Sequence, residues 1–356
     1  MKDFTYTPNA QRVVFGSGCL EQLQQELERL GIQHALVLCT PQQREDAQRI
    51  AARLGPTCAG VFDRAAMHVP AALASDASAH ARQLGADGLV AFGGGSTTGL
   101  AKAIALEEGL PILAIPTTYA GSEVTSIYGV TGAGVKRTGK DPRVLPKTVL
   151  YDPTLTHSLP RHVSITSGIN AIAHAAEGLY AKDANPVISM MALEGAGALA
   201  QALPMIAGSD EAAAVGARAR ALYGAWLCGT VLGHVGMGLH HKLCHTLGGT
   251  FDLPHADTHT VVLPHALAYN EAAAPEPLAR FATALGRPGI GAGAAAFDLA
   301  LACGAPTSLA LLGLQERDLD EACDLALQNR YDNPRALERP ALRALLQDAY
   351  EGRRPG

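Results

Sequence analysis

Short apolar runs alternate with amphipathic stretches through the first ~150 residues of the chain. Runs of the length and composition of buried strands occupy residues 34–39, 58–62, 88–92, 111–115 and 147–151. Between them, residues 44–54, 70–84 and 98–107 have helical patterns, and a polar, glycine-rich stretch over 117–146 predicts loops with a hairpin. Strands that alternate with helices predict a parallel, Rossmann-like sheet.

The pattern changes after Asp152-Pro153. Alanine becomes abundant, β-branched runs thin out, and helical patterns dominate to the C-terminus. The chain is therefore predicted to hold an α/β dinucleotide-binding domain over residues 1–155 and an all-α domain over residues 156–356.

Composition and charge restrict the partners and the cellular compartment that the sequence predicts. The 356 residues are 48% hydrophobic and 17% charged, with a net charge of −5 and no basic run, so nucleic acid and membrane are not expected as partners. Seven cysteines without a CxxC pair predict free thiols in a reducing compartment. The apolar stretch 190–207 contains Glu194 and Pro204 and is predicted to be too short to span a bilayer. The N-terminus lacks a signal-peptide pattern. We therefore expect a cytoplasmic protein.

A glycine-rich turn joins the predicted strand 88–92 to the helix that follows. Gly93, Gly94 and Gly95 would let a backbone approach a pyrophosphate, and the helix start at Ser96 would offer free N–H groups. A plain tight turn, with Ser96 as a helix cap, explains the same residues. Thr117 and Thr118 follow the next strand and should lie beside the turn. Thr40 ends the second strand in place of an acid, so we expect little discrimination between NADH and NADPH.

Histidines gather in the predicted helical domain. Asn170 and His174 are four residues apart, as are His241 and His245, so each pair shares a helix face, and His255 follows a proline shortly after. The clustering indicates a proton-transfer or metal site. His234 and His240 are expected to be structural. The amide of Asn170 adds no negative charge to three neutral imidazoles, which disfavours a divalent cation. Reduction of a C=C bond conjugated to a carbonyl needs only hydrogen bonds and a positioned acid at these positions.

At its motifs the chain resembles the iron-containing alcohol dehydrogenase superfamily and, within it, the maleylacetate reductases. The resemblance covers nearly the whole chain and is carried by the motifs FGSG, GGGSTTGLAKAIAL, PTTYAGSEVTS, KDPRVLPKTVLYDP, SGINAIAHAAEGLYA and GLHHKLCHTLGGTFDLPHADTHTVVLPHALAYN. Metal-dependent relatives look like GGGSxxDxAK, DxxxH and PHG. This chain departs from them with Gly99, Asn170 and Ala256, as maleylacetate reductases do.

The resemblance implies a fold, a reaction and roles for residues. The fold would be the dehydroquinate synthase-like fold of iron-containing alcohol dehydrogenases, with the site in a cleft, and the protein is expected to be a homodimer. The reaction would be NADH- or NADPH-dependent reduction of the C=C bond of maleylacetate to 3-oxoadipate, without a metal, in the breakdown of aromatic compounds. Residues that would bind the cofactor are Thr40, Gly93, Gly94, Gly95, Ser96, Thr117, Thr118, Ser122, Val124 and Lys140.

In the other half of the implied site, His174, His241 and His255 lie where relatives bind metal, with Asn170 beside them. His245 would be nearest the reacting carbons. The dicarboxylate substrate needs cations, for which the candidates are Lys136, Arg137, Lys140, Arg143 and Lys242.

Three alternatives to this reductase remain at this stage. A metal-dependent alcohol dehydrogenase of the same fold is disfavoured by Asn170. An NAD-dependent lyase like dehydroquinate synthase shares the two-domain plan, but the glycine-turn and PTTYAGSE motifs favour the reductases. A dinucleotide-binding protein without activity would not need the histidines.

Overall fold

The chain forms two compact units, one α/β and one helical. The computed structural model describes residues 3–132, 135–328 and 331–356, and the side chains of Val135 and Lys136 are not described. Residues Pro8–Leu159 make up the α/β unit, and Pro160–Gly356 together with the segment before Pro8 make up the helical unit. Each unit is described by itself.

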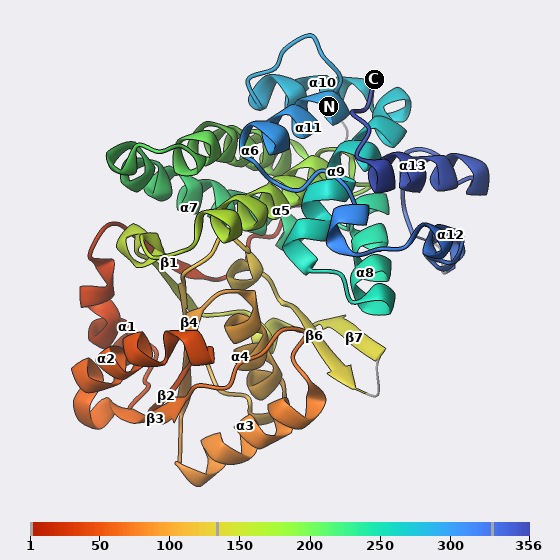
Figure 1. The fold of residues 1–356 in the computed structure, drawn as a ribbon. Helices are drawn as coiled ribbons and strands as arrows, with labels where there is room; N and C mark the ends of the chain where they lie inside the picture. Colours follow the sequence, from red (N-terminus) through yellow and green to blue (C-terminus); the bar gives the residue numbers. More distant parts are fainter. Residues whose placement is uncertain (1–2, 133–134, 329–330) are drawn as a thin grey trace. The chain divides into compact units, whose positions relative to one another are not determined.

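A six-stranded parallel sheet forms the centre of the α/β unit (Figure 1). Its strand order is β1-β8-β5-β4-β2-β3, and every neighbouring pair is parallel. The strands are β1 (Arg12–Phe15), β2 (Ala35–Leu38), β3 (Cys58–Phe62), β4 (Gly88–Gly93), β5 (Ile112–Pro116) and β8 (Thr148–Tyr151). The chain moves outward from β2 to β3 and then returns to β4 and β5. The sheet therefore changes direction between β2 and β4, where such sheets bind ligands.

Alternate residues of the strands pack against helices on opposite faces of the sheet. Leu36 and Leu38 of β2 belong to the same hydrophobic cluster as residues of α3 (Ala71–Gln83) and α4 (Gly95–Glu108). Ala35 and Val37 belong to a second cluster with α1 (Leu23–Arg29) and α2 (Arg44–Leu54). Burial on both faces explains why the strands read as continuous apolar runs rather than as alternating ones.

The predicted strands and helices of this unit are confirmed, with shifts of a few residues at some ends. The hairpin expected within residues 117–146 is formed by β6 (Ile127–Gly132) and β7 (Val135–Lys140). The sequence pattern missed β1 and α1. β1 is an edge strand with exposed and half-buried positions, so it lacks the fully apolar pattern of the central strands.

The helical unit is built from nine described helices and three short 3-10 turns. The helices are α5 (Arg161–Tyr180), α6 (Pro186–Ala207), α7 (Glu211–His234), α8 (Leu239–Phe251), α9 (His255–Asn270), α10 (Pro275–Ala284), α11 (Ala292–Ala302), α12 (Leu319–Leu327) and α13 (Arg339–Glu351). α5 is buried along nearly its whole length, and small residues allow close packing: a side chain on Gly178 would meet Val231 of α7 at 2.1 Å. The buried face of α5 carries the candidate site residues.

The boundaries of the two units differ by a few residues from the predicted domain bounds. The predicted division after residue 155 lies a few residues before the Leu159/Pro160 boundary, and the segment up to Thr7 groups with the helical unit instead of the α/β domain. The ring of Tyr6, in this segment, lies 5.3 Å from the ring of His234 on α7.

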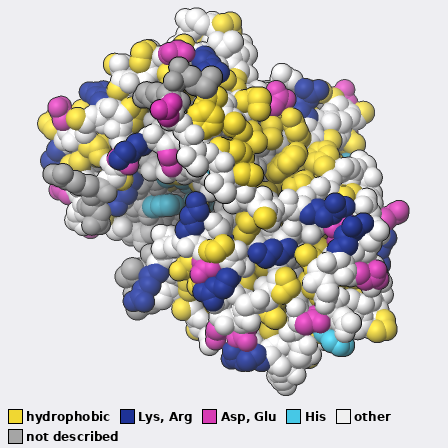
Figure 2. Space-filling view, turned by 180° about the vertical axis from the view of Figure 1, so that it is seen from behind, with side chains coloured by type: hydrophobic (Ala, Val, Ile, Leu, Met, Phe, Trp, Pro, Cys, Tyr) yellow, Lys and Arg dark blue, Asp and Glu magenta, His cyan; other side chains and the backbone are white. Residues whose placement is uncertain are grey.

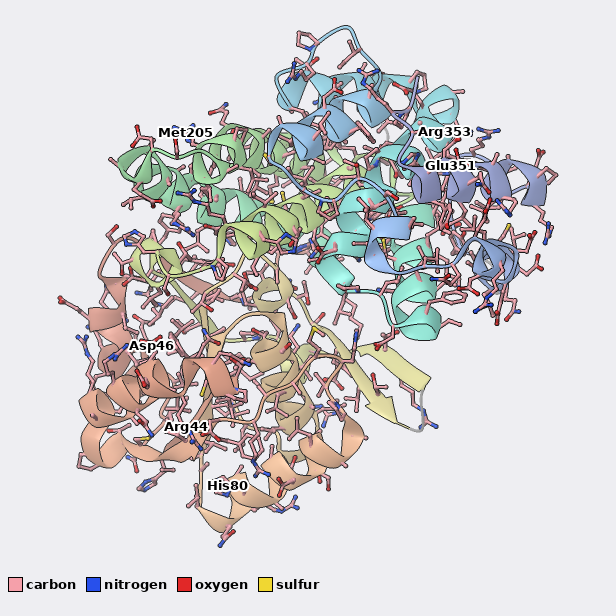
Figure 3. All side chains as sticks on the ribbon, in the orientation of Figure 1. Arg44, Asp46, His80, Met205, Glu351 and Arg353 are labelled. Atoms are coloured by element: carbon pink, nitrogen blue, oxygen red, sulfur yellow. The ribbon has the colours of Figure 1, made fainter. Side chains whose placement is uncertain are left out.

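The apolar stretch over 190–207 is part of a longer helix than predicted. α6 has 22 residues, so by length and composition it could cross a membrane, as could the bent pair α7 and α8 taken together. Core helices of soluble proteins pass the same test. The exposed side chains of α6 include Met190 and Met205, and Figure 3 labels Met205. Hydrophobic side chains also gather on one face in the space-filling view of Figure 2.

Candidate active site

The glycine turn after β4 has the geometry of a phosphate-binding turn. Gly93 has φ +150°, and a side chain there would lie 2.5 Å from Thr97 Oγ1. Gly94 is the N-cap of α4 and Gly95 its first residue, and no side chain caps the helix. Gly95 and Ser96 therefore present first-turn N–H groups at the positive end of a 14-residue helix, which suits an anion. The cap role considered for Ser96 is not found.

Polar side chains from neighbouring strands surround this turn. The backbone N–H of Thr117 donates to the carbonyl of Gly93 at 3.1 Å, and a side chain on Gly94 would lie 2.8 Å from Thr118. Gln43, which the sequence analysis missed, donates to Thr117 Oγ1 at 2.9 Å and accepts from Thr40 at 3.2 Å. The ends of β2, β4 and β5 thus bring Thr40, the glycines and both threonines together.

A buried lysine holds the segment that follows. The ammonium of Lys102 on α4 is fully buried and donates to the carbonyls of Ser122 and Ile127, each at 2.7 Å, and to Thr125 Oγ1 at 2.9 Å. Burial lowers the pKa of Lys102 to about 7, while the three acceptors match the three donors of its protonated form. Lys102 therefore fixes the turn Ser122–Val124, in which Val124 itself is only 2% exposed.

Glu123, in the same turn, is also buried, and it accepts a hydrogen bond from the hydroxyl of Tyr151 at 2.7 Å. Burial raises the pKa of Glu123. Lys140 lies exposed at the end of β7. The sequence analysis missed Lys102 and Glu123, although a single lysine inside the apolar run of α4 was a usable signal.

An ion pair near the end of β2 bears on the choice between NADH and NADPH. Arg44, at the start of α2, pairs with Asp63, which follows β3 (Figure 3 labels Arg44). Both groups act on the nearby thiol of Cys39, whose pKa is raised to about 11 by burial and by Asp63 and lowered by Arg44. An acid is thus present at this corner, but it comes from β3 and already has a cationic partner.

In the helical unit, one face of α5 carries Asn170, His174 and Glu177. These positions are four and three residues apart, so the side chains share a face, and all are at most 5% exposed. Asn170 Oδ1 and His174 Nδ1 have no hydrogen-bond partner within the described part of the chain. Unpaired buried polar atoms are costly, and they mark a place where a ligand can bind.

Glu177 connects α5 with the start of α8. Its carboxylate accepts the backbone N–H of Gly238 at 3.0 Å and of His240 at 2.8 Å, and so caps an otherwise uncapped helix. The same carboxylate lies 2.6 Å from Nδ1 of His241, while Nε2 of His241 is buried and without a partner among the described residues. Sequence analysis missed Glu177, although it lies one helical turn from His174.

His240, Cys244 and His259 form a second buried group next to these residues. Nε2 of His240 lies 2.9 Å from Nδ1 of His259 and 3.7 Å from Sγ of Cys244. In the described part of the chain this is the only His, Cys, Asp and Glu group whose ligand atoms all lie within 4.8 Å of one another. Two nitrogens bound to one tetrahedral zinc would lie about 3.3 Å apart, so the 2.9 Å distance is that of a hydrogen bond.

The protonation of this group agrees with a hydrogen-bonded network. Burial raises the pKa of Cys244 well above its ordinary value, and burial with neighbouring histidines lowers the pKa values of His240 and His259 well below theirs. His240, expected to be structural, is therefore part of the histidine cluster, and His259 had not been singled out at all.

The remaining predicted histidines lie at the edge of this cluster. The ring of His255, at the start of α9, is 4.4 Å from the ring of His259. The exposed His245 on α8 has its ring 6.3 Å from that of His241. The ring of His174 stacks 5.1 Å from His241, and its pKa is lowered well below the ordinary value by burial and by His241 and His255. All four predicted histidines thus gather with Asn170 on α5, α8 and α9.

The candidate cations for a dicarboxylate differ in their availability. Arg143 is engaged, because it pairs with Asp141 at 2.8 Å and donates to the carbonyl of Leu106 at 3.2 Å. Arg137 is exposed and Lys242 is half-buried on α8 beside His241. The side chain of Lys136 lies outside the described residues.

One cavity of the helical unit, of about 350 Å³, reaches this region only through Glu177 and Gly238. Most of its lining comes from the ends of α5 and α7 and the segment after α12, including Lys182, Asp183 and Asp332. It contains none of the predicted site residues.

Comparisons with known proteins identify the family of the chain. Residues 10–153 match the iron-containing alcohol dehydrogenase family, and residues 164–350 match the C-terminal region of the Fe-containing alcohol dehydrogenase family. The chain is 58% identical to a maleylacetate reductase of Burkholderia cepacia over 355 residues, which covers 100% of both chains.

Solved structures similar to this chain agree with the sequence comparisons. A putative alcohol dehydrogenase from Ralstonia eutropha JMP134 superposes with a TM-score of 0.98 at 63% identity, and the maleylacetate reductase of Rhizobium sp. strain MTP-10005 with a TM-score of 0.95 at 54% identity. Each comparison covers 100% of both chains.

The chain therefore belongs to the iron-containing alcohol dehydrogenase family. It is an enzyme of the oxidoreductase class with the fold expected from its sequence, and its resemblance to maleylacetate reductases is confirmed. The lyase and the protein without activity are set aside.

Proposed function

We propose that this enzyme reduces the C=C bond of maleylacetate to give 3-oxoadipate, with NADH or NADPH as hydride donor and without a metal, in the cytoplasmic breakdown of aromatic compounds. The observation that carries the proposal is the 58% identity over the whole chain to a maleylacetate reductase. The seven free cysteines are in keeping with a reducing compartment.

Residues of the α/β unit fit a nicotinamide dinucleotide. The close approaches at Gly93 and Gly94 leave no room for side chains, so the backbone itself can approach a pyrophosphate at the start of α4. Thr117 and Thr118 would hydrogen-bond the phosphates or ribose, and the turn at Ser122 held by Lys102 would line the nicotinamide side with Val124 and Lys140. When bound, the cofactor supplies a hydride.

Residues of the helical unit would manage the oxygens and the proton of the substrate. Hydride addition at the carbon distant from the ketone places negative charge on the ketone oxygen as an enolate. His174, His241 and His255, with Asn170, would hold the substrate's oxygens, and His245 would deliver the proton to the neighbouring carbon. Lys242, beside His241, would help to receive a substrate carboxylate.

Donor chemistry supports independence from metal. Asn170 offers a neutral amide where a carboxylate would offset the charge of a dication. Among the described residues, the only group of His, Cys, Asp and Glu ligand atoms that all lie within 4.8 Å of one another is that of His240, Cys244 and His259, and it does not include His174, His241 or His255. Because an amide stands in place of the carboxylate, we expect these residues to hold a divalent ion only weakly, and no step above involves one.

The test is oxidation of NADH or NADPH on addition of maleylacetate, with the product identified by mass spectrometry. Formation of 3-oxoadipate in step with cofactor oxidation supports the proposal. Turnover of simple aldehydes or ketones, but not of maleylacetate, would favour the metal-dependent alcohol dehydrogenase of the same family. The expected homodimer is checked separately by light scattering.

A further inference from the structure

Within the histidine cluster, the carboxylate of Glu177 lies against the ring of His241. Its side chain is 1% exposed and that of His241 is 7% exposed, with 2.6 Å between Oε2 and Nδ1. The rings of His174, His240, His259 and His245 surround His241 with centroid distances between 5.0 and 6.3 Å. His241 is therefore the ring that this carboxylate orients.

The backbone around Glu177 fixes which partner donates. Both carboxylate oxygens accept backbone N–H groups at the start of α8, from Gly238 to Oε2 and from His240 to Oε1. A carboxylate that sits among N–H donors at a helix start acts as an acceptor, so Nδ1 of His241 carries the hydrogen. The neutral ring then keeps its lone pair on Nε2, which is the atom without a partner.

We propose that Glu177 is a positioning residue that holds His241 as the Nδ1–H tautomer and so makes Nε2 the atom that exchanges a proton with a substrate oxygen. When Nε2 takes up a proton from solvent, the imidazolium forms 2.6 Å from the Glu177 carboxylate and can donate that proton to the enolate oxygen. The enol oxygen returns the proton to Nε2 when the neighbouring carbon is protonated. A buried acid orients histidine in this way in hydrolase triads, where it sets the tautomer without itself gaining the proton.

The structure offers a matched control for the capping role. Glu271 also places a carboxylate oxygen at a helix start, where it accepts the N–H of Ala292 at 2.9 Å at the first turn of α11. No hydrogen bond or ion pair to a histidine is found for it among the described residues. Glu271→Gln thus removes a capping charge in the same unit, whereas Glu177→Gln removes a capping charge and the orienting acceptor together.

The test is the tautomer of His241 in the protein labelled with ¹⁵N-histidine, read from long-range ¹H–¹⁵N correlations and assigned by the signals missing in His241→Gln. The wild-type protein should show Nδ1–H with an unprotonated Nε2. Glu177→Gln should shift the ring toward the other tautomer, and Glu271→Gln should not. A wild-type His241 that carries its hydrogen on Nε2 overturns the proposal, whether or not any variant folds.

Kinetics provide the second readout. This role rests on the proposed reaction, but the tautomer is measured without substrate, so the two can fail separately. Glu177→Gln should lower kcat by about 10- to 100-fold, as loss of an orienting partner commonly does, with the Kd for NADH unchanged. Wild-type kcat in Glu177→Gln, or an equal loss in Glu271→Gln, would contradict it.

Discussion

Four buried histidines should make the helical unit sensitive to acid. They are His174, His240, His259 and His265, each with a pKa lowered chiefly by burial. A histidine whose pKa is lower in the folded state binds its proton first in the unfolded chain, near pH 6.5. Its contribution to stability is therefore fully present above about pH 6.5 and is lost as the pH falls toward the folded pKa.

His265 on α9 gives the magnitude for one group. It is 4% exposed, its Nε2 has no described partner, and burial lowers its pKa to about 4 against a smaller opposing effect of Asp348. The full loss between pH 6.5 and 4 is about 3 kcal/mol for this residue. His174, His240 and His259 add losses of the same sign, because burial lowers each of their pKa values. A typical total stability is only about 5–15 kcal/mol.

Urea titrations at a series of pH values test this prediction. Trp226 on α7 is the only tryptophan, so its fluorescence reports the helical unit. Between pH 6.5 and 5, His265→Gln should reduce the slope of the unfolding free energy against pH by about 1 kcal/mol per pH unit on average. His34→Gln, an exposed change in the α/β unit, serves as the control. An unchanged slope in His265→Gln would show that folding does not lower the pKa of His265.

Three further predictions concern the site. Asn170→Asp should create measurable binding of Fe²⁺ or Zn²⁺ by supplying the missing carboxylate, and calorimetry that finds no binding would show that the amide is not what excludes metal. His245→Ala should lower kcat by about 10²- to 10⁴-fold with little change in NADH binding by fluorescence titration, and retention of more than about a tenth of wild-type kcat would move the proton to another group. NADH and NADPH should differ by less than about 100-fold in kcat/KM, or under about 3 kcal/mol. The reason is that Thr40 carries no charge and Asp63 is paired with Arg44. Complete refusal of NADPH would mean that Asp63 still repels the 2′-phosphate.

The parts of the fold that depend on local pattern could be predicted from the sequence. The central strands are buried on both faces, so their apolar runs stand out. Gly93 and Gly94 mark the turn because the positive φ of Gly93 and close approaches at both residues exclude side chains. The edge strand β1 was missed, since it has only four residues and none of them is fully buried. The grouping of the N-terminal segment with the helical unit was missed too, and the ring contact found there joins Tyr6 and His234, far apart in sequence.

In the site, residues that share one helix could be predicted and partners from different helices could not. The four-residue spacing of Asn170 with His174, and of His241 with His245, was sufficient to place each pair on one face. The bond from Glu177 to His241 joins positions 64 residues apart, and no periodicity reports it. His259 pairs with His240 in the same way, across α8 and α9, so its role appears only when the helices are assembled.

The most direct test of metal-independent reduction of maleylacetate combines metal analysis with kinetics on one preparation. The purified protein is analysed for Fe and Zn, treated exhaustively with a chelator, and assayed with maleylacetate and NADH. We expect far less than one ion per chain and an unchanged rate of 3-oxoadipate formation after chelation. About one tightly bound ion per chain, with activity lost on its removal and restored by its return, would contradict the account.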